Sequence, residues 1–233
     1  MRFENKIVIV TGASIGIGKA CALQFAKEGA VVLAVDIKGI DYVNENITEY
    51  ICDVSDEEAV NKTVEDILKN YGRVDVLVNN AGIWRTDNFP FKDSKSEYWK
   101  KKINVNILGT MYFTHAVINS MIERRYGRII NLGSVAGVYG NAGMADYSMT
   151  KGAIHSFTVA LAKEVTEYGI TVNSVSPGNV KDTPESKDIP ALSYANRSST
   201  PDEIANVIAF VASDDASWVS GQNYIVDGCR KKL

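Results

Sequence analysis

The stretch VIVTGASIGIGKA, residues 8–20, decides the fold class of this 233-residue chain. An apolar, β-branched run leads into Gly12, and Gly16 and Gly18 then open a segment with helical spacing. Glycines at such a junction let the backbone approach a pyrophosphate closely, and the helix N-terminus offers free N–H groups and a positive dipole end. The spacing is GxxxGxG rather than GxGxxG, yet the strand before it and the helix after it predict a nucleotide-phosphate site.

Similar apolar runs recur along the chain, and segments with helical spacing lie between most of them. The runs are KIVIV, VVLAV, VDVLV, RIINL, TVNSV and NYIV, and a further strand ends in ICD. Continuously apolar strands that alternate with amphipathic helices indicate a parallel sheet covered on both faces. We therefore predict an α/β fold, a single doubly wound (Rossmann) domain over residues 1–233, with about seven parallel strands and helices on both faces. No linker, composition change or internal repeat indicates a second domain.

One long segment, residues 177–199, breaks both periodicities and holds three of the five prolines. A loop of this length inside a compact domain is more often a lid or binding loop than a plain connection. We expect it to be a short substrate loop.

The composition argues against several function classes. The net charge of −3 gives no electrostatic reason to expect nucleic acid or a membrane surface as a partner. The three cysteines are widely spaced without a CxxC pair, which favours a reducing compartment. Two histidines give a metal site or a Ser-His-Asp triad little to build on, so no metal is expected. No apolar run approaches a membrane span or a signal peptide, so we expect a soluble, cytoplasmic protein.

Two acidic residues at strand ends bear on the choice of nucleotide. Asp36 ends the second strand, where a carboxylate can hydrogen-bond both ribose hydroxyls of NAD and would repel the 2′-phosphate of NADP. Ile15 offers no charge to offset a phosphate, although Lys38 lies close enough to blur the preference. Asp53 ends the third strand, where it could accept from the adenine amino group. We therefore predict NAD, with NADP as the less expected cofactor, and keep a plain turn acid as the competing interpretation of Asp36.

A tyrosine stands four residues before a lysine at two places in the chain. Tyr147 and Lys151 form one pair, and Tyr98 and Lys102 form the other. Four residues is about one helical turn, so either pair could place a phenol beside an ammonium. The spacing alone does not decide between them, and the basic run 100–102 is by itself typical of a solvated helix face.

A series of short motifs decides between the pairs. NNAG stands at 79–82, NVN at 104–106, NLGSVAG at 131–137, YSMTK at 147–151 and SPG at 176–178, and VSGQNYIVDG lies near the C-terminus. In order and separation this series resembles the short-chain dehydrogenase/reductase family over nearly the whole chain, including its 3-oxoacyl-acyl-carrier-protein reductases and glucose 1-dehydrogenases. The resemblance selects Tyr147 and Lys151, and it leaves Tyr98 and Lys102 on a helix surface.

The resemblance implies a catalytic set of Asn106, Ser134, Tyr147 and Lys151. Reduction of a ketone needs a proton donor at the carbonyl oxygen, and the reverse reaction needs a base there. A lysine ammonium one turn away would favour the phenolate of Tyr147 and lower its pKa. Ser134 can donate to the same oxygen, and by resemblance the carbonyl of Asn106 holds a water that passes protons to Lys151. The plainer interpretations are a strand-end cap for Ser134 and a mid-helix asparagine for Asn106.

The resemblance also implies which residues contact the cofactor. They are Thr11, Gly12, Ser14, Ile15, Gly16, Ile17, Gly18, Asp36, Asp53, Val54, Asn80, Ala81, Gly82, Tyr147, Lys151, Pro177, Gly178, Val180 and Thr183. Within NNAG, we expect Asn80 to tie neighbouring strands together and the backbone of Ala81 and Gly82 to face the cofactor.

The chain departs from the family pattern after SPG. Asp182 stands where the family has a threonine, so Thr183 would have to take over that role from one position later. The loop is also about seven residues shorter than in typical bacterial 3-oxoacyl reductases. The candidates for lining the substrate pocket are Trp84, Arg85, Asn141, Met144 and Asn179. Arg85 could meet a carboxylate or phosphate, or it could be a solvated loop arginine.

These observations predict an NAD(H)-dependent oxidoreductase that transfers hydride between nicotinamide and a secondary alcohol or its ketone. Because cellular NAD is mostly oxidised, the NAD preference favours a sugar or polyol dehydrogenase over the alternative, a 3-oxoacyl-acyl-carrier-protein reductase-like enzyme. The rival from another class is a non-catalytic NAD-binding sensor or scaffold, which would be expected to lose part of the catalytic set. By resemblance, the helix beginning near Gly152 and the C-terminal strand would pack against copies of themselves in a homotetramer or homodimer.

Overall fold

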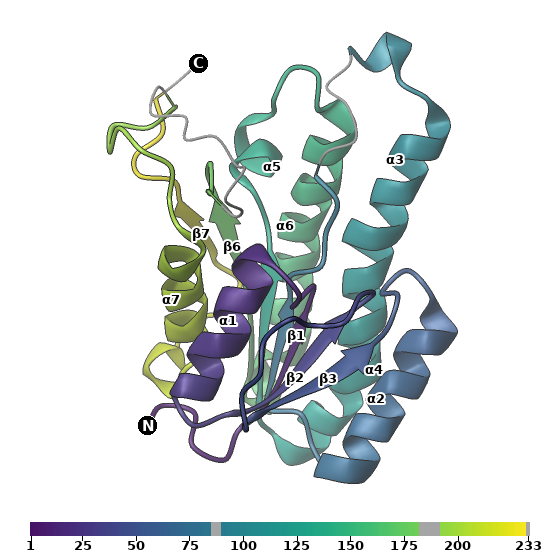
Figure 1. Cartoon of the computed structure of the whole chain (residues 1–233), viewed down its shortest axis with the longest axis vertical. Coiled ribbons are helices and arrows are strands. Elements are labelled where there is room, and N and C mark those ends of the chain that lie inside the picture. Colours follow the sequence, from purple (N-terminus) through teal and green to yellow (C-terminus); the bar gives the residue numbers. More distant parts are fainter. Residues whose placement is uncertain (85–89, 182–191, 232–233) are drawn as a thin grey trace.

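The computed structural model describes residues 1–84, 90–181 and 192–231. Seven strands form one sheet in the order β3-β2-β1-β4-β5-β6-β7, and every neighbouring pair is parallel (Figure 1). The strands are β1 (Ile7–Thr11), β2 (Val31–Asp36), β3 (Ile47–Ile51), β4 (Val76–Asn79), β5 (Gly127–Leu132), β6 (Ile170–Pro177) and β7 (Asn223–Val226). The predicted doubly wound parallel sheet is confirmed.

The central strands account for the unbroken apolar runs of the sequence. Every residue of β1, β4, β5 and β6 is buried, because helices cover both faces of the sheet and leave these strands no solvent-facing side. The edge strands β3 and β7 contain exposed polar residues such as Glu49 and Asn223. The buried centre of the sheet is therefore the rigid part of the molecule from which the loops of the site extend.

Helices form a layer on each face of the sheet (Figure 1). Those named in the figure are α1 (Gly16–Lys27), α2 (Glu57–Tyr71), α3 (Ser96–Lys102), α4 (Gly109–Arg124), α5 (Val135–Tyr139), α6 (Ala145–Val165) and α7 (Pro201–Val211). One core contains Phe25 of α1 and Ile208 of α7. The other contains Ile67 of α2, Phe113 of α4 and Val165 of α6. The chain runs outward from β1 through β2 to β3 and returns to β4 on the other side of β1, so the strand order reverses at the place where α/β proteins bind ligands.

A π-helix, Ile103–Leu108, joins α3 to α4 without a break. At its end the N–H of Gly109 donates to the carbonyl of Asn104, five residues earlier. Single π-helical turns inside α-helices are rare and occur frequently at functional sites. This one carries Asn106, which is buried.

The C-terminal segment runs beside the end of the predicted substrate loop. Ser193 bridges to Arg230 in the antiparallel sense, and Val180 bridges to Ser199. The intervening residues 182–191 lie outside the described part of the chain, and with them lies the predicted contact Thr183. Within the described ranges, we find no helix long and apolar enough to cross a membrane.

Candidate active site

The glycine loop forms a backbone cradle between β1 and α1. Gly12 and Gly16 adopt φ angles of 65° and 58°, which residues with a Cβ rarely adopt. A Cβ on Gly18 would lie 1.9 Å from the carbonyl oxygen of Gly12. The three glycines are therefore required by the path of the backbone itself, and the N-terminus of α1 is left open toward the carboxyl end of the sheet.

Side chains at the ends of β1 and β4 hold this cradle in place. The Asn80 side-chain amide donates to the carbonyls of Thr11 and Gly12, at 2.8 and 3.0 Å. The Thr11 hydroxyl accepts from the backbone N–H groups of Asn80 and Ala81. Asn80 thus ties the two strands together, as the sequence predicts. Thr11 is buried and supports the loop from behind.

A cleft of about 810 Å³ opens over the carboxyl ends of these strands. Its volume lies within the roughly 300–1,000 Å³ of small-molecule and cofactor sites. Predicted cofactor residues that line it are Gly12, Ser14, Ile15, Gly16, Ile17, Gly18, Asp36, Asp53, Val54, Asn80, Ala81 and Gly82, and the substrate candidate Trp84 also lines it. A glycine cradle at a helix N-terminus, opening into a cleft of this size, fits a dinucleotide.

The two predicted nucleotide acids line the cleft, but their oxygens already bond within the fold. Asp36 Oδ2 accepts from the backbone N–H of Ser14 at 2.9 Å, and Oδ1 accepts from that of Lys38 at 3.0 Å. Asp53 Oδ1 accepts from the N–H and the hydroxyl of Ser55. Backbone donors therefore stabilise the negative charge of Asp36 before any ligand arrives.

Several lysines line the same cleft, and sequence reasoning missed two of them. Lys38 stands after β2, and Lys100 and Lys101 belong to the last turn of α3. The sequence predicts a solvated helix face for the basic run, whereas Lys100 and Lys101 line the nucleotide cleft. Their position just before NVN at 104–106 is the sequence signal for this location, because Asn104 and Val105 of that motif line the cleft too.

Helix α6 carries the predicted tyrosine–lysine pair. Lys151 is buried, and its Nζ donates to the carbonyl of Leu132 at 2.6 Å. The same nitrogen lies 6.0 Å from the centre of the Tyr147 ring. A Cβ built on Gly82 would lie 3.6 Å from it, so the ammonium is beside the NNAG loop. Lys151 is therefore beside the NNAG loop, whose residues line the cleft, and Tyr147 lies one helical turn earlier; neither of the two is among the residues that line the described cleft.

The electrostatics of the pair differ from the sequence expectation. Burial raises the pKa of Tyr147 above its ordinary value, and a hydrogen bond with Ser134 offsets part of the rise. Burial also lowers the pKa of Lys151 to about 8. The expected lowering of the tyrosine pKa by the lysine is therefore absent from this geometry, since desolvation dominates. A phenol with a raised pKa is protonated at neutral pH and can act as a proton donor.

Ser134 lies at the end of β5 and has two roles in the structure. It is the N-cap of α5, and its hydroxyl accepts from the N–H of Ala136 at 3.1 Å. It also hydrogen-bonds Tyr147. The strand-end cap, predicted as the plainer role of Ser134, is thus present together with a hydrogen bond to the tyrosine.

Asn106 connects the π-helix to two parts of the site. Its Oδ1 accepts from the N–H of Ile83 at 2.7 Å, and its Nδ2 donates to the Ile83 carbonyl and to Thr150 Oγ1, each at 3.0 Å. Its own carbonyl accepts from the Thr110 hydroxyl at 3.1 Å. The asparagine side chain therefore joins the NNAG loop to α6 and does not bond its own backbone.

The other predicted residues lie in three places. Asn141 and Met144 precede α6, with Asn141 Nδ2 3.8 Å from Met144 Sδ. Pro177 ends β6, and Val180 follows it in the bridge to Ser199. The predicted substrate residue Arg85 lies outside the described residues.

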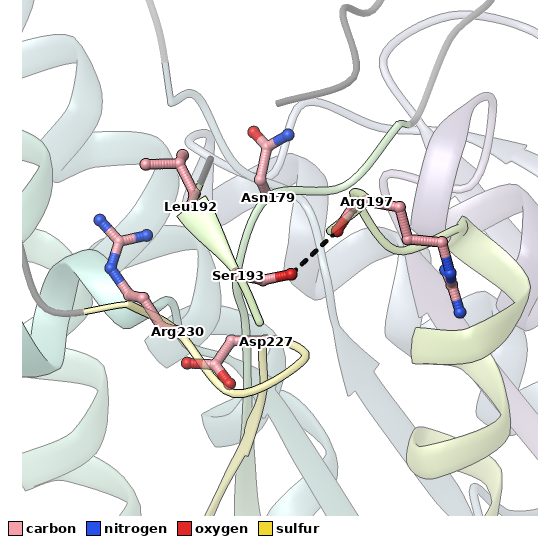
Figure 2. A pocket seen from close by; sticks show the side chains of 7 residues that line it. Asn179, Leu192, Ser193, Arg197, Asp227 and Arg230 are labelled. Carbon is pink, nitrogen blue, oxygen red and sulfur yellow. Dashed lines mark hydrogen bonds between the residues drawn. The ribbon is translucent and has the colours of Figure 1, made fainter. Parts of the chain in front are cut away.

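Gly178 and Asn179 line a second, much smaller cavity (Figure 2). Its volume is about 10 Å³, enough for about one water. Asn179 there donates to Ser198 Oγ at 2.5 Å. In the described structure these two residues therefore surround a water-sized space and do not line the large cleft.

Lys102 lies in a different environment from the one that the sequence predicts. The family resemblance leaves it on a helix surface, but its side chain is only 4% exposed. Its Nζ lies 2.6 Å from Asp146 Oδ2, directly before Tyr147. Lys102, from the tyrosine–lysine pair that the resemblance does not select, is therefore close to the pair that it does select, Tyr147 and Lys151.

Known proteins are similar to this chain over most of its length. The family model described as short chain dehydrogenase matches residues 6–191. The 3-oxoacyl-[acyl-carrier-protein] reductase FabG of Thermotoga maritima is 40% identical over 245 residues, covering 98% of each chain. FabG of Escherichia coli is 39% identical over 241 residues, again with 98% of each chain covered. A solved structure of ElxO with NADP bound has a TM-score of 0.91 and 32% identity, covering 96% of this chain and 98% of that one.

These neighbours overturn the expectation of NAD. Besides ElxO with NADP bound, a tyrosine-to-phenylalanine variant of ElxO with NADPH bound matches with the same TM-score of 0.91. NAD would be favoured by an Asp36 carboxylate that is free to bond ribose hydroxyls and to repel a phosphate. Two backbone N–H groups instead engage that carboxylate, and Lys38 lies beside it in the cleft wall.

Proposed function

Because this chain belongs to the short-chain dehydrogenase family, we propose that it is an NADPH-dependent reductase of 3-oxoacyl groups carried on acyl carrier protein. The observation that carries the proposal is the 39–40% identity to FabG proteins over 98% of both chains. The sugar or polyol dehydrogenase interpretation depended on NAD, so it loses its support together with that cofactor.

The chain's own residues would supply the proton and the alignment of the carbonyl. Bound NADPH supplies the hydride in such a reaction. Tyr147 would donate its phenolic proton to the substrate oxygen, a role supported by its raised pKa. Ser134, hydrogen-bonded to that phenol, would donate to the same oxygen and orient it. Lys151, whose Nζ lies 6.0 Å from the centre of the Tyr147 ring, would then return a proton to the tyrosinate.

The charges around the cleft support binding of the phosphorylated nucleotide. The 2′-phosphate of NADPH adds nearly two negative charges at neutral pH, given a second phosphate pKa near 6. Lys38, Lys100 and Lys101 line the cleft together with Asp36, Asp53 and Glu97, and these lysines can offset the added charge where the phosphate lies beside them. Asp36 faces the same space, but its oxygens accept two backbone hydrogen bonds. We therefore assign NADPH rather than NADH as the reductant.

We further propose that the protein acts in the cytoplasm as a homotetramer. All three cysteines are free, which suits a reducing compartment. Large apolar side chains are exposed on α6, at Met149 and Val159, on α7, at Phe210, and on β7, at Ile225. Helices and an edge strand with such faces are suited to contact between copies. Light scattering at micromolar concentration tests the assembly, and a purely monomeric protein would refute it.

A coupled binding and turnover experiment tests the function. NADPH and NADH binding is measured by fluorescence, and oxidation of each at 340 nm is followed with acetoacetyl-acyl carrier protein and with acetoacetyl-coenzyme A. We expect NADPH to bind more tightly, both thioesters to be reduced, and Tyr147→Phe to bind NADPH while losing at least about 100-fold in kcat. NADPH binding without reduction of either thioester would favour the non-catalytic rival. Preferential use of NADH would refute the cofactor assignment.

A further inference from the structure

A buried ion pair joins the end of α3 to the first turn of α6. Lys102 Nζ lies 2.6 Å from Asp146 Oδ2, and the two side chains are 4% and 12% exposed. A pair this well buried is a poor source of stability, because desolvation of both charges cancels much of their attraction. Its presence therefore calls for a role beyond holding the two helices together.

The pair is connected directly to the backbone of the proposed proton donor. Asp146 uses Oδ2 for Lys102, and its Oδ1 accepts from the backbone N–H of Tyr147 at 2.7 Å. Tyr147 lies in the first turn of α6, where backbone N–H groups have no partner within the helix. Asp146 thus provides the missing acceptor, and Lys102 fixes the orientation of that carboxylate.

A second connection holds the carbonyl of the same residue. The Thr150 hydroxyl donates to the Tyr147 carbonyl at 2.8 Å and accepts from Asn106 Nδ2 at 3.0 Å. Lys102 and Asn106 are four residues apart on one helix, and Asp146 and Thr150 are four apart on the other. The segment from α3 to the π-helix therefore holds both backbone polar groups of Tyr147. It holds the N–H through Asp146 and the carbonyl through Thr150.

We propose that the Lys102–Asp146 ion pair positions Tyr147, so that the phenol is held at the depth and angle that proton transfer requires. This inference rests on the proposed role of Tyr147 as proton donor. Lys102 and Asp146 bond to each other, Asp146 also bonds to the backbone of Tyr147, and within the described part of the chain neither bonds to the glycine loop or to Asp36. We therefore expect replacement of the pair to affect the chemical step and to leave nucleotide binding unchanged.

The test compares three variants with the wild-type protein. Lys102→Met removes one charge and leaves the other buried without a partner, so it lowers both stability and kcat. Lys102→Met/Asp146→Leu replaces the pair by apolar side chains, which commonly restores stability but leaves the Tyr147 N–H without its acceptor. Lys163→Met is the matched control, because Lys163 is an exposed lysine of α6.

We expect the double variant to have a Tm near that of the wild type, an unchanged Kd for NADPH, and a kcat lowered by about 10- to 100-fold, the range a displacement of about 1 Å can cause. The control should match the wild type in all three. A double variant with wild-type stability and wild-type kcat would overturn the proposal, since the pair would then be purely structural. Because the double variant carries the comparison, a failure of Lys102→Met to fold does not affect the outcome.

A readout independent of turnover separates this inference from the proposed function. The ¹³Cζ resonance of Tyr147, assigned by its loss in Tyr147→Phe, reports the surroundings of the phenol. We expect it to be displaced in the double variant and unchanged in Lys163→Met, whether or not the chosen thioesters are substrates. If the wild type reduces no thioester but the resonance moves, the proposed function fails and the positioning role stands. A resonance that coincides with that of the wild type would refute the positioning role.

Discussion

Replacing Lys151 with methionine should change the pH dependence of stability in a specific direction. Burial lowers the pKa of Lys151 from 10.5 to about 8. Below pH 8 the side chain is charged in both the folded and the unfolded protein, so the folded state bears the whole desolvation cost. Between pH 8 and 10.5 the unfolded state binds more protons than the folded state, so stability rises with pH through this group.

The magnitude follows from the shift. Each pKa unit corresponds to about 1.4 kcal/mol, so the cost is about 3 kcal/mol at pH 7 and falls to about 1 kcal/mol at pH 10. Lys151→Met removes this cost but leaves the Leu132 carbonyl without its donor, a loss of about 1–3 kcal/mol that does not depend on pH. The difference in free energy of unfolding between the variant and the wild type should thus be about 2 kcal/mol less favourable to the variant at pH 10 than at pH 7.

Urea denaturation of the two proteins at pH 7 and pH 10, followed by circular dichroism, measures this difference. Besides burial, Lys151 also lowers the pKa of His155, but that group titrates below the pH range compared, so the titrations of the remaining groups largely cancel. Lys163→Met, at an exposed position of α6, serves as the control and should differ from the wild type by less than about 0.5 kcal/mol at both pH values. An equal effect of Lys151→Met at pH 7 and pH 10 would refute the reasoning, because it would mean that the folded protein does not depress the lysine pKa.

Three further predictions concern the cap, the cradle and the charges of the cleft. Ser134→Ala and Ser134→Gly should both lower kcat by about 100-fold, the effect of removing one donor to a reacting oxygen. In thermal denaturation only the alanine variant should lose about 1 kcal/mol of stability, because glycine is tolerated at an N-cap position. Equal stability of the two variants would contradict the role of Ser134 as a cap. Gly18→Ala should abolish measurable NADPH binding by fluorescence with little change in far-ultraviolet circular dichroism, since the Cβ would lie 1.9 Å from a backbone oxygen; retained binding would contradict the cradle. Lys38→Ala/Lys101→Ala should raise the Kd for NADPH by at least about tenfold, the equivalent of 1.4 kcal/mol, and leave the Kd for NADH unchanged. An equal effect on both Kd values would show that these lysines do not recognise the 2′-phosphate.

The sequence was sufficient for the fold because its signals were local and redundant. A strand buried on both faces has to be apolar throughout, and β1, β4 and β5 are of this kind. The glycine loop was equally legible, since the backbone leaves no room for a side chain at Gly18. The order and separation of the family motifs then predicted Ser134 and Tyr147 as site residues, which are separated in sequence and brought together by β5 and α6.

The prediction of NAD is wrong because the identity of a residue does not determine the electrostatic environment around it. Asp36 has the expected position at the end of β2, but which donors its oxygens meet depends on the loop after β1 and on the turn at Lys38. Lys101 comes from a helix more than sixty positions away in the sequence, yet it lines the same cleft. The potential at this end of the cleft is the sum of such contributions, and single positions in one sequence do not give that sum.

The burial of Lys102 is predictable from the sequence. Three consecutive lysines cannot form one solvated face, because a helix turns by about 100° per residue and cannot expose three neighbours equally. Lys102 stands one turn before Asn106, and an acid stands directly before Tyr147. If Asn106 faces α6, the side chain one turn earlier must face α6 as well, and a lysine there needs a carboxylate opposite it. The register of two helices, applied to residues already assigned to the site, would have predicted the Lys102–Asp146 pair.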